Sequence, residues 1–297
     1  MRRITLLTNP DKCNLHCPLC FLNQRAGEGC NFGLGEMPFE IARAAIEKYA
    51  AERDASGKRL LQEVIPSTMG EPLLYSHFDE LLEQCRTLGI PLNLTTNGTF
   101  PGKWGNEAGM ATLLHACSDI KVSHLASEQF DGWKANVEKL LNVRNSISDE
   151  TLVKSTPNKK NAKIATVSLQ VTLHRKNLKT VPELITWASS IGIDRIKWNP
   201  VVFLSVAPQE LREMYEIDES LLEPLRKELK TGVFSALNVK HDGSLFFENA
   251  ADHCAVGGKR GSCPFADEVW VWPDGHEDHC PNPEKRYVNK KTVCYFV

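Results

Sequence analysis

The sequence predicts an α/β protein built on a parallel sheet. Apolar segments of strand character alternate with segments of helical period over roughly the first two thirds of the 297-residue chain. Six strand–helix units in series favour a parallel sheet with right-handed crossovers, either doubly wound or barrel-like. From about residue 233 onward the pattern changes, and short β-like pieces, glycines and cysteines predict a second, smaller domain.

The strands are predicted from short apolar or alternating runs. The first run ends at Asn9-Pro10, and the fifth alternates Val, Leu, Val and Leu. The predicted strands cover residues 4–8, 62–66, 92–95, 120–123, 167–173 and 195–201. Ligands of doubly wound sheets and of barrels gather at the carboxyl ends of the strands, so the residues that follow these runs are candidate site residues.

The helices are predicted from apolar residues spaced three and four apart. In the first, Ile41, Ile46 and Tyr49 share one face, and glycines 89 and 192 follow two later segments in the position that ends a helix. The predicted helices cover residues 38–52, 78–88, 110–117, 133–141, 181–191 and 221–229. The polar stretch 144–163 is predicted to be an exposed loop.

The composition restricts the class of protein. A net charge of −2 provides no general attraction to nucleic acid or anionic membranes. A nucleic-acid-modifying enzyme has only the short basic stretch 154–163 in its favour, and such a run is usually a solvated loop. No apolar run has the length of a membrane span and no signal-peptide pattern is present, which predicts a cytoplasmic protein. The ten cysteines are then expected to be metal ligands or catalytic groups more often than disulfides.

Three cysteines follow the first predicted strand in "NPDKCNLHCPLCF", with the spacing Cys-x3-Cys-x2-Cys. One interpretation is a zinc site, with His16 as a fourth ligand beside Cys13, Cys17 and Cys20. The other is a cubane iron–sulfur cluster, which ordinarily takes four thiolates. Three thiolates would leave one iron open to a small molecule.

This motif resembles that of the radical S-adenosylmethionine (SAM) superfamily, and "STMGEPLL", "NLTTNGT", "IKVSHLA" and "IKWNPV" resemble its later motifs in the same order. The resemblance covers roughly residues 1–205. It implies a partial (β/α)6 TIM-like barrel and a 4Fe–4S cluster on Cys13, Cys17 and Cys20, with SAM on the open iron. It also implies an oxidoreductase-type enzyme that reductively cleaves SAM to a 5′-deoxyadenosyl radical, which abstracts hydrogen from a substrate C–H bond.

The resemblance also implies which residues contact SAM. The segment "MGEP" matches a Gly-Gly-Glu-Pro motif that binds the SAM amino group, except that Met69 replaces the first glycine. Ser123 stands where the family often contacts the ribose, and Leu19 stands where an aromatic residue often packs on adenine, a role that Phe21 can share. The implied SAM-contacting residues are Met69, Gly70, Glu71, Asn97, Ser123, Leu19 and Phe21.

A second set of cysteines lies near the end of the sequence, at Cys254, Cys263, Cys280 and Cys294. The spacing Cys-x11-Gly-x4-Cys resembles the start of the SPASM/twitch extension. The sequence lacks the further cysteine run of a full SPASM domain, so we expect a twitch-like domain with one auxiliary 4Fe–4S cluster. Four thiols saturate such a cluster, which favours electron transfer. A four-cysteine zinc site is the alternative.

The sequence names no catalytic acid or base. If Cys254 is not a ligand, it is a candidate hydrogen donor, and Cys30 in a glycine-rich loop is another. Cys85 and Cys117 fall on apolar helical faces and are expected to be core residues.

The resemblance divides the chain into a barrel (1–205), a helical link (206–232) and a twitch-like domain (233–297). It favours a ribosomally made peptide as substrate, with epimerisation, crosslinking or oxidation as the outcome. It implies a flavodoxin- or ferredoxin-type reductant. The alternatives are an epimerase or dehydrogenase of a small molecule (aminoglycoside, sugar or nucleoside) and a non-catalytic iron–sulfur or zinc-binding module.

Overall fold

The computed structural model describes residues 2–24, 33–66, 69–125, 132–147, 164–229, 240–243 and 267–279. Within these ranges one sheet has the strand order β7-β6-β5-β4-β3-β2-β1-β8-β9. The pairs are parallel from β7 to β8, and β9 is antiparallel to β8. The strands are β1 (Arg3–Leu6), β2 (Glu63–Pro66), β3 (Leu92–Thr96), β4 (Cys117–His124), β5 (Thr166–Leu173), β6 (Arg195–Pro200), β7 (Lys240–Gly243), β8 (Glu268–Val271) and β9 (Glu277–Asp278).

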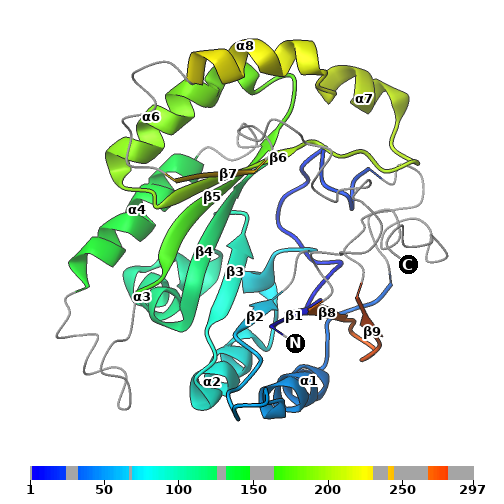
Figure 1. Ribbon diagram of the computed structural model, residues 1–297, viewed down its shortest axis with the longest axis vertical. Helices are drawn as coiled ribbons and strands as arrows, with labels where there is room; N and C mark the ends of the chain where they lie inside the picture. Colours follow the sequence, from blue (N-terminus) through cyan, green and yellow to red (C-terminus); the bar gives the residue numbers. More distant parts are fainter. Residues whose placement is uncertain are drawn as a thin grey trace.

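The helices form an arc around the outside of this curved sheet (Figure 1). They are α1 (Phe39–Ala51), α2 (Phe78–Leu88), α3 (Glu107–Ala116), α4 (Trp133–Ser146), α6 (Val181–Ile191), α7 (Gln209–Tyr215) and α8 (Glu219–Leu229), with short 3₁₀ turns η1 (Pro72–Leu74), η2 (Gly102–Gly105) and η4 (Leu178–Thr180). None of the helices in the described ranges has the length and apolarity needed to cross a bilayer.

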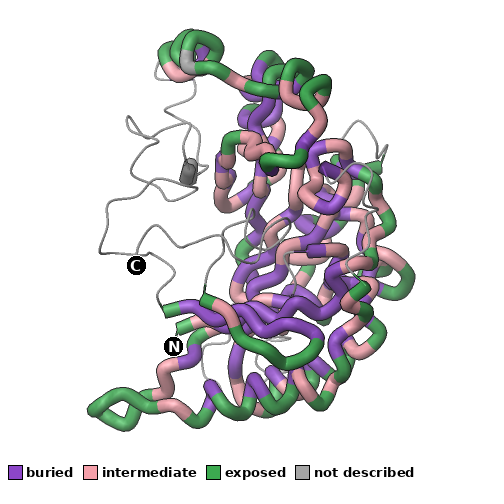
Figure 2. The backbone as a smooth tube through the Cα atoms, turned by 90° about the vertical axis from the view of Figure 1, so that its right-hand side faces the viewer, coloured by how far each residue is buried: buried purple, intermediate pink, exposed green. Residues whose placement is uncertain are grey.

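Strand order follows chain order from β1 to β6, so the sheet curls into a partial TIM-like barrel, as the sequence predicts. One residue in two of each strand points outward to the helices: Val64, Leu94, Ile120 and Val122 are fully buried in the core that the helices share. The buried backbone in Figure 2 traces this layer, with the exposed residues on the outer sides of the helices.

The structure changes some predicted boundaries. The third helix ends at Ala116, and Cys117 is already the first residue of β4, where it stays buried. Helix α7 has no counterpart among the predicted elements, because its seven residues are too short for a clear helical period.

Two described pieces of the segment 233–297 extend the main sheet. β7 pairs with β6, and β8 pairs with β1. A tight turn follows β8, with Gly275 at φ +85° and its amide donating to the Trp272 carbonyl at 2.8 Å. The rest of that segment lies outside the described residues, so the division into three parts remains a prediction.

Candidate functional site

The three cysteines of the N-terminal motif lie in the loop that leaves the carboxyl end of β1. Cys17 is buried, whereas Cys13 and Cys20 are half-buried. The second half of the loop turns as a helix does: the Cys20 amide donates to the Cys17 carbonyl at 3.0 Å, and the Gln24 amide donates to the Cys20 carbonyl at 2.9 Å. No disulfide joins cysteines of the described ranges. The loop therefore brings three thiols to the edge of the sheet where ligands bind.

The start of this loop is held against the turn that precedes η1. The Glu71 amide donates to the Lys12 carbonyl at 2.9 Å, and Asn9 Nδ2 donates to the Glu71 carbonyl at 2.6 Å. Gly70 has φ +75°, and a Cβ there would lie 2.2 Å from the Asn9 oxygen and 2.6 Å from the Lys12 oxygen. Only glycine permits this approach, so the "GEP" segment is fixed by the backbone of the cysteine loop.

The Glu71 carboxylate ties the same turn to the end of β3. It is 1% exposed and accepts hydrogen bonds from the Leu73 amide (3.2 Å), Thr96 Oγ1 (2.9 Å) and the Asn97 amide (2.7 Å). Burial raises the pKa of Glu71 to about 7, and the three donors act in the opposite direction. The predicted contact between Glu71 and the SAM amino group remains a prediction.

Asn97 joins β3 to the cysteine loop. Its Nδ2 lies 3.7 Å from Cys13 Sγ and donates to Asn14 Oδ1 at 2.9 Å. Its Oδ1 accepts from the Thr99 amide at 2.9 Å and from Thr99 Oγ1 at 2.7 Å, while Asn14 Nδ2 donates to Thr99 Oγ1 at 3.0 Å. These bonds fix the amide with its N–H groups towards the sulfur.

The donors around Cys13 fit a metal-bound thiolate. The Leu15 amide approaches Cys13 Sγ at 3.5 Å on a second side. Burial raises the pKa of Cys13, and the two N–H donors act against this shift by stabilising the thiolate. Hydrogen bonds to the ligand sulfurs are a feature of iron–sulfur sites. The residues present therefore fit an iron–sulfur cluster.

The described residues contain no group of three His, Cys, Asp or Glu side chains that converges on one metal ion. A cubane cluster does not require such convergence, because each thiolate binds a different iron. His16, the candidate fourth zinc ligand, is exposed. The roles of the three cysteines as ligands remain predictions.

A small apolar cluster covers the loop on the side of β8. Its buried members are Leu7, Leu22, Met69, Leu204, Trp270 and Trp272, with Cys20, Phe21 and Leu34 partly buried against them. Leu19 is 5% exposed. Met69 and Phe21 thus contribute to an apolar wall beside Cys20. The sequence alone did not predict that Trp270 of β8 and Trp272, which follows it, are part of this wall.

The chain is similar in sequence to several characterised proteins. No protein-family model matches the chain. The PqqA peptide cyclase of Xanthomonas campestris pv. campestris is 26% identical over 200 residues, which cover 65% of this chain and 45% of that protein. The tungsten-containing aldehyde ferredoxin oxidoreductase cofactor-modifying protein of Pyrococcus furiosus is 20% identical over 241 residues, 77% of this chain and 59% of that protein. The chain thus spans about half the length of these curated relatives.

Two solved structures share the fold. Streptococcus suis SuiB bound to S-adenosylmethionine superimposes with a TM-score of 0.61 at 16% identity, over 98% of this chain and 62% of that one. The anSMEcpe structure with bound AdoMet gives 0.61 at 14% identity, over 94% and 71%. At these identities the likeness establishes that the chain shares its fold with two S-adenosylmethionine-bound proteins.

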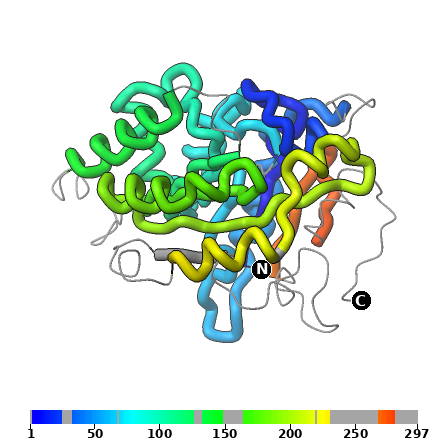
Figure 3. The backbone as a smooth tube through the Cα atoms, turned by 90° about the horizontal axis from the view of Figure 1, so that it is seen from above, coloured from blue at the N-terminus to red at the C-terminus, as the bar shows by residue number. Residues whose placement is uncertain are grey.

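Gln24 connects the cysteine loop to the segment that follows β6. It is fully buried, and its Nε2 donates to the Leu19 carbonyl (2.9 Å) and to the Val202 carbonyl (3.0 Å). Its Oε1 accepts from the Leu204 amide at 2.8 Å. Figure 3 shows the segment after β6 passing beside the dark-blue N-terminal loop. Gln24 therefore fixes the end of the loop, whereas Gly70 packs against its start.

Ser123 lies near the carboxyl end of β4, half-buried and in register with Gln170 of β5. Alternation along β4 directs its side chain to the inner face, and its carbonyl accepts from Trp133 Nε1 at 3.0 Å. Its contact with a ribose remains a prediction.

The other cysteines divide into two groups. Cys85 is buried in the helix-covered core, where burial raises its pKa to about 12, and Cys117 is buried there with its pKa also raised. Both environments are those of core residues. Cys30, Cys254, Cys263, Cys280 and Cys294 lie outside the described residues.

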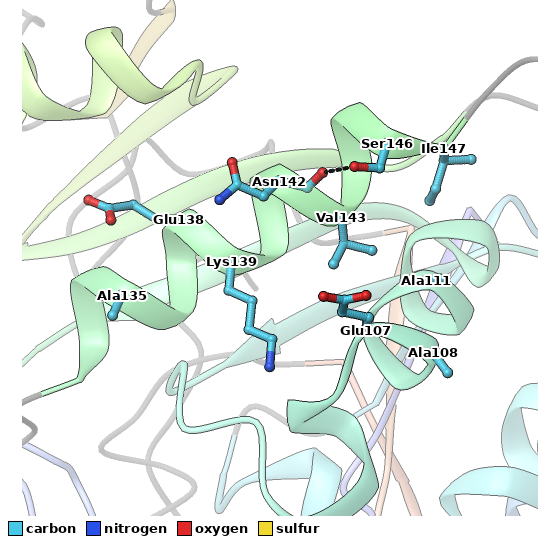
Figure 4. Close-up of a pocket in the computed structure, with 10 residues that line it drawn as sticks. All are labelled: Glu107, Ala108, Ala111, Ala135, Glu138, Lys139, Asn142, Val143, Ser146 and Ile147. Atoms are coloured by element: carbon cyan, nitrogen blue, oxygen red, sulfur yellow. Dashed lines mark hydrogen bonds between the residues drawn. The ribbon is translucent and has the colours of Figure 1, made fainter.

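A surface groove of about 550 Å³ lies between α3 and α4 on the outer side of the barrel (Figure 4). Lys139 and Glu107 line it, and the Lys139 ammonium is held by the Gly105 carbonyl at 2.8 Å. It contains none of the predicted site residues.

Sequence reasoning did not single out Asn9, Asn14 or Gln24 as site residues. Asn9 and Gln24 are fully buried polar side chains whose partners are distant in sequence, such as Glu71 and Leu204. Their one local signal is their position within or beside the cysteine motif.

Proposed function

We propose that Cys13, Cys17 and Cys20 hold a 4Fe–4S cluster, that SAM binds its open iron, and that the chain is a radical SAM enzyme. One observation carries this proposal. The loop with three thiols packs on the glycine of the "GEP" turn, and Asn97 donates to one of its sulfurs. When bound, the reduced cluster supplies the electron that cleaves SAM to methionine and a 5′-deoxyadenosyl radical, which abstracts hydrogen from a substrate C–H bond.

The chain's own residues bind and orient SAM and exclude water from it. The Met69–Gly70 turn presents backbone carbonyls, which accept hydrogen bonds from an ammonium group. Glu71 keeps that turn fixed against β3. The Ser123 hydroxyl faces the barrel interior and is available to a ribose. The apolar wall that includes Met69 and Phe21 shields one side of Cys20 from water.

A peptide is the substrate that the comparisons favour. The curated relatives include PqqA peptide cyclases, and SuiB has been solved with its precursor peptide SuiA and anSMEcpe with the Cp18Cys peptide. We propose that this chain modifies a ribosomally made peptide. A small-molecule epimerase or dehydrogenase is the second candidate, because the chain covers only 45% of the PqqA peptide cyclase.

We further propose an auxiliary 4Fe–4S cluster on the C-terminal cysteines, serving electron transfer. The β8–β9 hairpin lies between Cys263 and Cys280 in the sequence and is docked on the barrel: Lys48 Nζ pairs with Glu277 at 2.8 Å. His279 Nδ1 lies 3.2 Å from the Glu268 carbonyl, so the two ends of the hairpin leave the sheet side by side. A flavodoxin- or ferredoxin-type protein is the proposed source of electrons.

The test is cluster content and SAM cleavage. After anaerobic reconstitution we expect about eight irons per chain, and 5′-deoxyadenosine on addition of SAM and dithionite. Cys17→Ala should lose about four irons and all of the 5′-deoxyadenosine. Cys85→Ala is the matched control, since it removes a buried thiol away from the loop and should retain both.

Each result bears on one part of the proposal. Iron retained in Cys17→Ala would contradict the cluster assignment. About four irons in the wild type, all lost in Cys17→Ala, would remove the auxiliary cluster and leave SAM cleavage intact.

A further inference from the structure

The inner face of this barrel is polar at a depth where barrels of this kind are usually filled by branched apolar side chains. Ile120 and Val122 of β4 point outward into the helix-covered core, so Lys121 between them points inward. The same alternation directs Gln170 and Lys197, which are register partners on β5 and β6, to the interior. All three are half-buried. We call them the inner polar layer.

Nearer the amino ends of the strands, two arginines pair with three carboxylates, which leaves one negative charge in excess. Arg3 lies 3.7 Å from Glu63 and 3.4 Å from Glu268, and Arg195 lies 2.6 Å from Asp119. We call these five residues the amino-end layer. Each of its carboxylates has an arginine partner.

The two lysines of the inner polar layer have no such partner. Lys121 Nζ donates to the neutral Asn93 Oδ1 at 2.7 Å. Lys197 makes no hydrogen bond or ion pair with any residue whose side chain the structure describes, a set that excludes residues 240–243. Burial lowers the pKa of Lys121 to about 8, with repulsion from Lys197 and Arg195 adding to the effect and Asp119 and Glu63 opposing it. Both lysines also act on Glu268, whose pKa burial raises and their charges lower. The two lysines thus add two positive charges to a layer with one excess negative charge, and neither has a carboxylate within ion-pair distance among the side chains that the structure describes.

An enclosed cation without a partner costs free energy, and such groups are normally paired. Further donors lie beside the two lysines. The Gln170 amide is the register neighbour of Lys197, and Arg195 Nε is buried with no hydrogen-bond partner among the described residues. Ammonium and amide donors together match the lone pairs of an oxyanion, which accepts several charge-assisted hydrogen bonds at once.

We propose that Lys121, Gln170 and Lys197 form a binding site for an oxyanion group of the substrate, a carboxylate or a phosphate, inside the barrel. This inference rests on the proposed function, because it locates the substrate on the strand face that leads to the cysteine loop. It also narrows the substrate class to molecules with an anionic group placed away from the reacting C–H bond.

The test uses the reconstituted full chain and two probes, inorganic phosphate and glutarate, each titrated at constant ionic strength while the thermal midpoint Tm is followed. We expect a saturable rise in Tm with one of the probes, which assigns the oxyanion as phosphate or carboxylate. Lys121→Met and Lys197→Met should each raise the Kd for that probe about 10-fold or more, because a charge-assisted contact is lost. Lys179→Met, at an exposed position of η4, should leave Kd unchanged.

Stability without a probe gives a second readout. Removing an uncompensated cation should leave the Tm of Lys197→Met equal to or above that of the wild type. A lower Tm would show that Lys197 is paired within the protein and would overturn the proposal. Equal Kd values in the wild type and both inner-layer variants, or no saturable binding of either probe, would overturn it too.

The SAM affinity separates this inference from the proposed function. We expect Lys121→Met and Lys197→Met to bind SAM as the wild type does. Loss of SAM binding would assign the oxyanion to the SAM carboxylate and overturn the substrate assignment. A wild type that binds phosphate but forms no 5′-deoxyadenosine would contradict the proposed function alone. One that forms 5′-deoxyadenosine but binds neither probe would contradict this inference alone.

Discussion

The two ends of the barrel use polar residues in different ways. At the amino end, the buried or half-buried charges of Arg3, Glu63, Asp119, Arg195 and Glu268 pair with each other across strands. At the carboxyl end, side chains such as Asn9, Glu71 and Gln24 bond mostly to the backbone of loops.

This difference separates the residues that stabilise the barrel from the residues that position the candidate site. At the amino end, side chains that form ion pairs with each other have few hydrogen-bonding groups left for a ligand. A side chain that hydrogen-bonds to loop backbone instead positions neighbouring groups that stay available to a ligand. The Cys13 sulfur and the carbonyls of the Met69–Gly70 turn are such groups. The carboxyl end is therefore the end whose disturbance should alter cofactor binding, as in other barrels.

The largest expected effect is at Gly70. We expect Gly70→Ala to destabilise the protein by about 3 kcal/mol or more and to abolish cluster assembly, since its Cβ would overlap two carbonyls of the cysteine loop. Gly89→Ala is the matched control, because Gly89 also has a positive φ (+60°) but no atom within 4 Å of the added carbon. It should cost about 1 kcal/mol and keep the cluster. Denaturant unfolding measures the stability of the two variants, and iron content measures their cluster assembly. Equal effects at the two glycines would contradict a special role for the contact between Gly70 and the cysteine loop.

The buried Glu71 should make stability depend on pH. Its pKa is about 7 in the folded protein against an ordinary value of 4.5, so the folded state binds more protons between these values. The free energy of unfolding should therefore fall as pH rises from about 4.5 to about 7, by about 3 kcal/mol in total from this group. Urea unfolding at a series of pH values checks this. Glu71→Gln should lack this component, and a wild type and variant with parallel pH profiles would refute it.

Asp119→Asn tests the amino end. It weakens the pair with Arg195, whose side chain is 36% exposed, and we expect a loss of about 2 kcal/mol in the free energy of unfolding. The rate of 5′-deoxyadenosine formation should not change. Asp79→Asn, in an exposed pair with Lys103, should cost about 0.5 kcal/mol or less. Loss of SAM cleavage in Asp119→Asn at unchanged stability would contradict the idea that the amino end serves stability and the carboxyl end serves cofactor binding.

The smallest of the expected effects on the site is a shift in reduction potential at Asn97. Asn97→Ala removes the N–H donor to Cys13 Sγ, so the reduction potential of the bound cluster should become more negative. Redox titration followed by electron paramagnetic resonance measures the shift. Asn136→Ala, which removes an amide that donates to the Gly98 carbonyl, serves as the control and should leave the potential unchanged. An unshifted potential in Asn97→Ala would show that this contact does not act on the cluster.

Much of the local structure was predictable from the sequence. The alternation of apolar residues in β5 and the helical period of α1 reflect contacts within one element, and the glycine after α2 ends it in the left-handed conformation, with φ +60°. Boundaries were less predictable where two elements join directly, as at Cys117, because burial continues across the junction.

By itself the sequence determined the order of strands and helices and the spacing of the three cysteines, because both are short-range patterns. Only the tertiary structure decided which groups meet around the thiols. Gly70 meets the carbonyls of Asn9 and Lys12, and Gln24 meets residues about 180 positions away. The tertiary structure likewise decided that β8 joins β1 and that Lys121 and Lys197 share one interior. Such contacts depend on how the whole sheet curls, and no local period in the chain encodes that.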